Sequence, residues 1–123
     1  KNIYPYLKKS KAFVLTSLWE DPGFVLVEAA FCNKTIISSS CPNGPIEILN
    51  NGKNGYLFEP NSSEQFLQIF DKFISDKKET KKTKIINLKK KCKEFTMYRH
   101  FKILYKIINK WKLINQIKFY IIS

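Results

Sequence analysis

The chain has 123 residues and a formal net charge of +12, from 22 Lys and Arg against 10 Asp and Glu. This length is enough for one domain with a hydrophobic core. The charge is uneven: seven Lys and eight acidic residues precede Lys77, whereas fourteen Lys, one Arg and two Glu follow from there. Nucleic-acid-binding proteins depend on Arg, whose planar fork matches phosphates and guanine edges. A single arginine, Arg99, therefore argues against a nucleic-acid partner.

Two further classes are excluded by composition. No charge-free run of 18 apolar residues is present, so the sequence predicts no membrane-spanning helix. Cys32, Cys41 and Cys92 have neither a CxxC spacing nor a paired histidine, which argues against a zinc site. Reduced cysteines of this kind are typical of a cytosolic protein.

The first elements predict a parallel βαβ unit. Residues 2–10 read as a short helix, and Ala12–Thr16 is apolar enough for a buried strand. A loop then leads into a helix from about Gly23 to Cys32, which has Pro at its entry and is apolar on every side except at Glu28. The β-branched stretch Thr35–Ser38 is the second strand. Strand, helix and strand in this order give a parallel pair.

Two carboxylates mark this unit. Glu28 is the lone charge of a helix expected to be buried, a costly arrangement unless a partner is present. Glu20 precedes the helix, where unpaired backbone N–H groups and the positive end of the helix dipole attract anions. This loop also follows a strand of a parallel sheet, at the edge where such sheets bind ligands. A nucleotide sugar, with hydroxyls at both ends and anionic charge between them, suits this layout.

The middle of the chain continues the same pattern. Pro45 opens a one-turn helix, and turn signals (NNG, NG) lead to a third strand at Tyr56–Phe58. Ser62 is expected to cap a following helix. The residues expected to face inward from that helix are Phe66, Leu67, Ile69, Phe70 and Phe73.

The basic end of the chain is expected to be helical. Lys77–Lys84 is so polar that it reads as a hinge or an exposed helix end, and Ile85–Phe95 as a helix. Thr96 is the expected cap of a helix from Met97 to about Trp111. The predicted positively charged face of that helix consists of Lys102, Lys106 and Lys110. The opposite, apolar side consists of Phe101, Leu104, Tyr105, Ile108 and Trp111.

Three blocks in this order resemble one enzyme family. The first is Glu20-(seven residues)-Glu28, followed by AAFC and TIIS; the others are SCPNGPIEIL (Ser40–Leu49) and NGKNGYLFEP (Asn51–Pro60). Together they resemble the donor-binding signature of glycosyltransferase family 4, retaining enzymes of the GT-B fold. The resemblance implies an α/β fold: a Rossmann-like parallel sheet with flanking helices, forming the C-terminal half-domain of such an enzyme, with a helical C-terminus. It divides the chain into a donor-binding part, residues 1–76, and basic C-terminal helices, residues 77–123.

The resemblance assigns roles to the two carboxylates. Glu28 matches the residue that holds the ribose hydroxyls of the donor nucleotide, since two oxygens accept from two vicinal hydroxyls. Glu20 matches the residue that orients the donor sugar, which makes it the catalytic candidate, although nothing identifies it as a nucleophile. The alternatives are a buried carboxylate paired with a lysine or with backbone amides for Glu28, and an exposed loop acid favoured by the helix dipole for Glu20.

The loop between them adds four donor-binding candidates. Gly23 permits close backbone approach, and the N–H groups of Gly23, Phe24 and Val25 would face the diphosphate or sugar. Asp21 belongs to the same pocket and, with Pro22, departs from the family's commoner Gly-Phe-Gly form, which would alter the sugar accepted. The alternative is an ordinary strand-to-helix turn. Residues 44–47 would line the nucleotide side of the cleft, unless Glu47 only braces its loop.

The resemblance also implies partners. The donor would be a UDP-sugar, from which a hexose or N-acetylhexosamine passes to a glycan or lipid-linked acceptor, without a metal and without a DxD motif. The chain begins at Lys1, inside an expected helix, and is interpreted as a piece of a longer cytoplasmic enzyme whose N-terminal domain is missing. Alternatives are a basic module that associates with membranes or nucleic acid, and an inactive truncated glycosyltransferase. The basic region has three open interpretations: a solvated face, contact with an anionic membrane at its cytoplasmic side, or docking on the missing domain.

Overall fold

The computed structural model describes the backbone of residues 2–122 and the side chains of residues 2–112. Two compact units are present, Lys1–Cys92 and Lys93–Ser123, and the first extends past the division expected at residue 76. The first unit contains α1 (Tyr4–Lys9), β1 (Ala12–Leu15), α2 (Phe24–Phe31), β2 (Thr35–Ser39), α3 (Pro45–Ile48), β3 (Tyr56–Phe58), α4 (Ser63–Ser75) and α5 (Lys78–Cys92). The second contains a single 3-10 turn (Lys93–Phe95) and α6 (Met97–Ile122).

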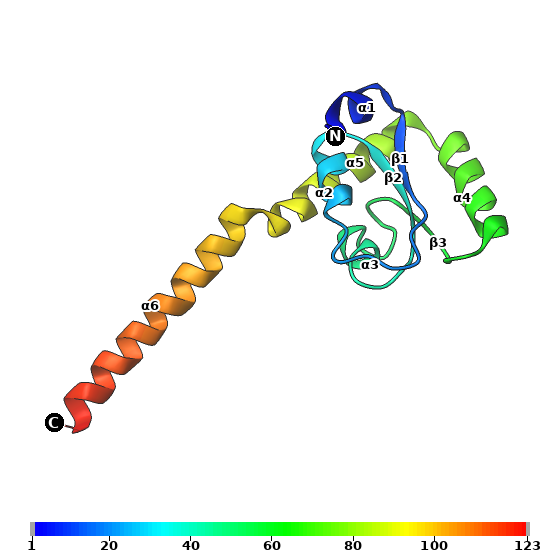
Figure 1. Ribbon diagram of the computed structural model, residues 1–123. Helices are drawn as coiled ribbons and strands as arrows, with labels where there is room; N and C mark the ends of the chain where they lie inside the picture. Colours follow the sequence, from blue (N-terminus) through cyan, green and yellow to red (C-terminus); the bar gives the residue numbers. More distant parts are fainter. Residues whose placement is uncertain (1, 123) are drawn as a thin grey trace. The chain divides into compact units, whose positions relative to one another are not determined.

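The centre of the first unit is a three-stranded sheet of order β1-β2-β3 in which both pairs are parallel (Figure 1). Ala12 pairs with Thr35, and Ile37 pairs with Tyr56. Every residue of β2 is buried, as expected of the central strand of a parallel sheet. The predicted α/β class, a Rossmann-like parallel sheet with flanking helices, is confirmed.

Helix α2 connects β1 to β2 and ends where the sequence predicts. Asn33 has φ +59°, and Lys34 N–H bonds back to Ala29 O, so the helix is closed by a left-handed residue. The prediction that α2 is buried on all sides is wrong, because Phe24 is 53% exposed and Phe31 is 42% exposed. An apolar helix without a polar face is buried only where neighbouring elements cover it. This face of α2 has no cover among the residues described.

Helix α4 packs against β3. The Ser62 hydroxyl accepts a hydrogen bond from Gln65 N–H, as predicted for the cap. Four of the five predicted inward residues pack on the core cluster of Ile37, Tyr56 and Phe58; they are Phe66, Ile69, Phe70 and Phe73. Leu67 is the exception at 59% exposure. At about 100° per residue, Leu67 lies well off the stripe that Phe66 and Phe70 share.

Helix α5 contacts α2, α3 and β2, on the side of the sheet opposite α4 (Figure 1). Leu88 and Cys92 are its fully buried residues. The helix begins at Lys78, so of the two interpretations of residues 77–84, a hinge or an exposed helix end, the structure shows the helix end. Lys84 Nζ donates to the carbonyls of Gly52, Lys53 and Gly55 at 3.0, 3.3 and 3.0 Å, and it lies 4.8 Å from the centre of the Tyr56 ring. A charged side chain therefore ties α5 to the turn before β3.

The second unit is almost entirely α6. The Thr96 hydroxyl accepts from Arg99 N–H at 3.4 Å, so the predicted cap is confirmed. The helix continues well past the expected end near Trp111, to Ile122. Within the described residues, no helix combines the length and the apolar character needed to cross a bilayer.

Candidate functional site

The candidate site lies where the chain leaves β1 and enters α2, at the carboxyl edge of the parallel sheet. Ser39, the last residue of β2, donates from its hydroxyl to Ser17 O at 2.5 Å. Ser39 is fully buried. The start of the β1–α2 loop is thereby tied to the end of the neighbouring strand, at the edge where open parallel sheets bind ligands.

Glu20 folds over the start of α2. Gly23 is the N-cap of the helix, with φ +74°, a conformation that suits glycine. A Cβ atom placed on Gly23 would lie 3.6 Å from both Cβ and Oε2 of Glu20. The Glu20 carboxylate is half-buried and accepts no hydrogen bond from the part of the chain that the structure describes. It is positioned beside the helix N-terminus with its oxygens available.

The first N–H groups of α2 are also available. Along the chain from Gly23, the first N–H group that donates a hydrogen bond is that of Leu26, which bonds to Gly23 O at 2.9 Å. Among the described residues, no acceptor is found for the N–H groups of Gly23, Phe24 or Val25. Together with the helix dipole, such groups form an anion-binding end. They are the same three groups to which the sequence analysis gives a donor-binding role, and that role stays a prediction.

A second loop closes on the first. Gly44 has φ +151° and packs so tightly that a Cβ atom there would collide with Pro22 O. The loop before α3 therefore rests on the backbone of the β1–α2 loop. A pocket of about 430 Å³ opens on the α3 side. Its lining residues are Asn43, Gly44, Ile46, Glu47, Asn50, Asn51 and Lys91.

Several of residues 44–47 border this pocket. Glu47 is exposed and lines the pocket, and no N–H of the described chain donates to its carboxylate. Among the described residues Glu47 thus makes no hydrogen bond that would brace its loop, and its place on the nucleotide side of the cleft stays a prediction. Lys91 reaches the same pocket from α5, and sequence reasoning missed it, because its position depends on the packing of α5 against α3.

Glu28 lies one helical turn beyond Phe24, a rise of about 6 Å. Its side chain is half-buried, and no described residue forms a hydrogen bond or ion pair with the carboxylate. The alternative of a buried carboxylate held by a lysine therefore finds no partner among the described residues. Phe24, Glu28 and Phe31 share the uncovered face of α2. A polar ligand on that face would meet a carboxylate bordered by aromatic rings.

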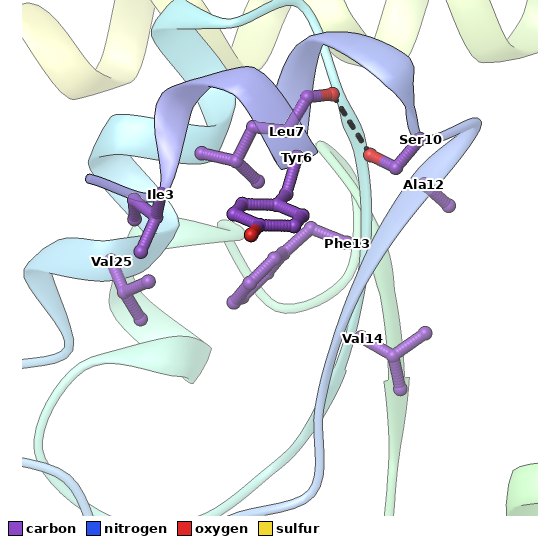
Figure 2. Close-up of a pocket in the computed structure, with 8 residues that line it drawn as sticks. All are labelled: Ile3, Tyr6, Leu7, Ser10, Ala12, Phe13, Val14 and Val25. Atoms are coloured by element: carbon purple, nitrogen blue, oxygen red, sulfur yellow. Dashed lines mark hydrogen bonds between the residues drawn. The ribbon is translucent and has the colours of Figure 1, made fainter. Parts of the chain in front are cut away.

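The remaining two candidates contribute differently. Asp21 is exposed in the loop, and its peptide bond to Pro22 is cis. The Val25 side chain lines a separate apolar pocket of about 360 Å³ between α1, β1 and α2 (Figure 2). The other lining residues are Ile3, Tyr6, Leu7, Ser10, Ala12, Phe13 and Val14. Only the backbone of Val25 is therefore available to the candidate site.

The remaining residue types are potential metal ligands and cysteines. Among the described residues, no group of three or more His, Cys, Asp or Glu is placed to hold a metal ion. Cys32, Cys41 and Cys92 are free thiols, and burial raises the pKa of Cys92 to about 11. A thiol with a raised pKa is a poor nucleophile at neutral pH. Cys92 is therefore a core residue.

Comparison with known proteins identifies the family of the chain. The family described as Glycosyl transferases group 1 matches residues 1–92, which is the first compact unit. The chain belongs to this family. The resemblance noted in the sequence is thereby confirmed at the level of group 1, and the narrower family 4 stays a prediction.

Individual relatives match different lengths of the chain. The lipopolysaccharide 1,6-galactosyltransferase of Escherichia coli K12 is 28% identical over 102 residues, which are 83% of this chain and 28% of that protein. A glycosyltransferase of Methanocaldococcus jannaschii is 45% identical over 49 residues, 40% of this chain and 12% of its own length. A probable sucrose-phosphate synthase of Thermosipho melanesiensis is 40% identical over 63 residues, 50% of this chain and 15% of its own. The chain thus spans at most 28% of these relatives.

Proposed function

We propose that this chain is the donor-binding region of a retaining glycosyltransferase. Group 1 membership supports glycosyl transfer in general, and the candidate site supports the donor side of it. The observation that carries the proposal is the convergence at the start of α2. There the Glu20 carboxylate lies against Gly23, beside three N–H groups that the described chain leaves without acceptors.

Each part of a nucleotide sugar has a counterpart in this arrangement. The diphosphate would bind the N–H groups of Gly23, Phe24 and Val25, where the helix dipole stabilises negative charge. Glu20 would accept from the sugar hydroxyls and so act as the catalytic positioning group. Glu28, on the open face of α2, would accept from the two ribose hydroxyls. Asp21 would border the sugar pocket.

The finer features of the reaction are part of the same proposal. The donor would be a UDP-sugar carrying a hexose or N-acetylhexosamine, and the acceptor a glycan or a lipid-linked glycan at the cytoplasmic face of a membrane. An acceptor-side N-terminal domain would complete the cleft. No metal would be needed, because the helix N-terminus supplies the charge stabilisation for the diphosphate that a divalent cation supplies elsewhere.

A calorimetric titration of the full chain with UDP, GDP and their sugars tests the proposal. Glu28→Ala should weaken binding of UDP itself by about 10-fold or more, because it removes two charge-assisted hydrogen bonds. Glu20→Ala should leave UDP affinity unchanged and remove the additional affinity for the UDP-sugar. Both effects should persist in the presence of a chelator.

Glu79→Ala is the matched control, because Glu79 is an exposed carboxylate at the start of α5, away from the candidate site. It should bind nucleotides as the unchanged chain does. Equal losses in all three variants would contradict the assigned roles. If the folded chain binds no nucleotide, and a longer polypeptide containing it also binds none, the donor-site proposal fails.

A further inference from the structure

Helix α6 has two chemically distinct faces, and neither is used by the candidate site. The side chains at the spacing 4-3-4-3 are apolar and exposed; they are Met97, Phe101, Leu104, Ile108 and Trp111. The side chains on the opposite face are cationic; they are Arg99, Lys102, Lys106 and Lys110. At 100° per residue these two sets are centred on opposite sides of the helix. The helix is therefore a basic amphipathic helix.

The charge of α6 has one sign only. The last acidic residue of the sequence is Glu94, so no acidic side chain is interspersed with the cations of residues 97–123. By contrast, several lysines of α5 are held by specific contacts within the first unit. Lys81 bonds to Ile74 O and stacks on Phe73, and Lys84 and Lys89 bond to oxygens of the turn and of Asn33. Among the described residues, Lys102, Lys106 and Lys110 form no such contact within their own unit.

We propose that α6 binds the surface of an anionic lipid bilayer, lying in the plane of the interface. Such a surface covers both faces at once, since the acyl boundary receives the apolar side chains and the headgroups neutralise the cations. A nucleic acid would pair with the cations and leave Phe101 and Trp111 in water. Tyr105 and Trp111 also have the mixed apolar and polar character that is favoured at a membrane interface.

A second copy of the helix fits less well. The 4-3-4-3 spacing would form a coiled-coil seam. The positions flanking the seam carry Tyr105 and Ile107 instead of the paired charges that fix partner and register. The apolar face is thus wider than a seam, and a pair of such helices would gain no complementary charge. These features favour a lipid surface.

Vesicle binding by the full chain tests this inference. A Trp19→Phe variant leaves Trp111, which is 68% exposed, as the one tryptophan to report on α6. Its emission should shift to the blue on addition of vesicles of phosphatidylcholine with phosphatidylglycerol, and not with phosphatidylcholine alone. Each basic residue contributes about fivefold to such binding, so Lys102→Gln, Lys106→Gln and Lys110→Gln together should weaken it about 100-fold.

Two further variants separate a helical anchor from general attraction of a basic protein. Lys78→Gln, Lys82→Gln and Lys90→Gln remove the same charge from exposed positions of α5 and should weaken binding far less. Leu104→Gln with Ile108→Gln keeps the charge and the helix propensity, and should weaken binding by about tenfold or more. The inference does not rest on the donor site, and all these variants should retain whatever nucleotide affinity the chain has.

Three outcomes would overturn the inference. Equal losses for the α5 and α6 lysine variants would show that net charge alone attracts the vesicles. Equal binding to vesicles with and without phosphatidylglycerol would remove the role of the cations. Absence of vesicle binding by the folded chain would also reject it, and light scattering would then show whether a second copy covers the apolar face.

Discussion

Single residues hold the two loops of the candidate site together. Gly44 packs directly against Pro22 O, and this contact joins the α3 loop to the β1–α2 loop. Sequence reasoning identified the GPIE block and the EDPGF block, but not that one rests on the other. Spacing along the chain carries no information about which backbone atoms of two loops meet in space.

Gly44→Ala is expected to destabilise the chain by about 2 kcal/mol, because it adds both an unfavourable φ and a collision with backbone. Urea unfolding measures this. Gly52→Ala is the control, since Gly52 also has a positive φ, +79°, but its added Cβ would meet only the end of Leu57 at 3.9 Å. A cost for Gly44→Ala no larger than that for Gly52→Ala would show that the loop contact contributes nothing.

Cys92 should make stability depend on pH in the alkaline range. Burial raises the pKa of its thiol in the folded chain from 9.0 to about 11, while Lys91 acts in the opposite direction. The unfolded chain then loses the thiol proton first, so stability present below pH 9.0 is lost as the pH rises toward about 11. Cys92→Ala should lower stability overall but flatten this dependence. Parallel pH profiles of the urea midpoint for the two chains would contradict the assignment.

The elements were predicted best where local signals were strong. The strand Tyr56–Phe58 was placed correctly by the turn residues before it, and Ser62 and Thr96 were recognised as caps. For the start of α5 the sequence allows both a hinge and an exposed helix end, because a run of lysines resembles a solvated segment. The Lys84 ammonium instead donates to three backbone carbonyls and lies over an aromatic ring, all of residues far away in sequence.

Lys84 is therefore expected to stabilise the packing of α5 on the rest of the first unit. Lys84→Met keeps the apolar stem but leaves the turn carbonyls of residues 52–55 without their donor. The expected loss is about 2 kcal/mol, within the range of hydrogen bonds to charged groups. Thermal and urea unfolding would measure it. Lys82→Met, at an exposed position of the same helix, should change stability by less than about 0.5 kcal/mol.

For the whole molecule, the predicted fold class holds, but the compact unit is longer than the sequence indicated. The donor-like features alone favoured a division at residue 76, whereas packing of α5 against α2, α3 and β2 extends the unit to Cys92. The family match ends at the same residue. Whether a helix is part of a compact unit depends on the residues it packs against, and its own composition does not show which residues those are.

A chain ending at Cys92 should accordingly fold as the full chain does. All of the buried hydrophobic residues described lie at or before Cys92. The free energies of unfolding that urea titrations give for residues 1–92 and 1–123 should agree within about 0.5 kcal/mol, because the second unit contributes no described residue to the buried core. A clearly less stable short chain would show that the second unit supports the first.

The order of the sheet has a practical consequence. Within residues 2–122, β1 pairs only with β2, so its other edge presents a row of backbone N–H and C=O groups beside the exposed Val14. Such an edge is a template for strand addition by another chain. Concentrated samples should therefore associate edge to edge, and their light scattering should grow with concentration. Ligand titrations belong at low protein concentration, with the mass of the species checked in each.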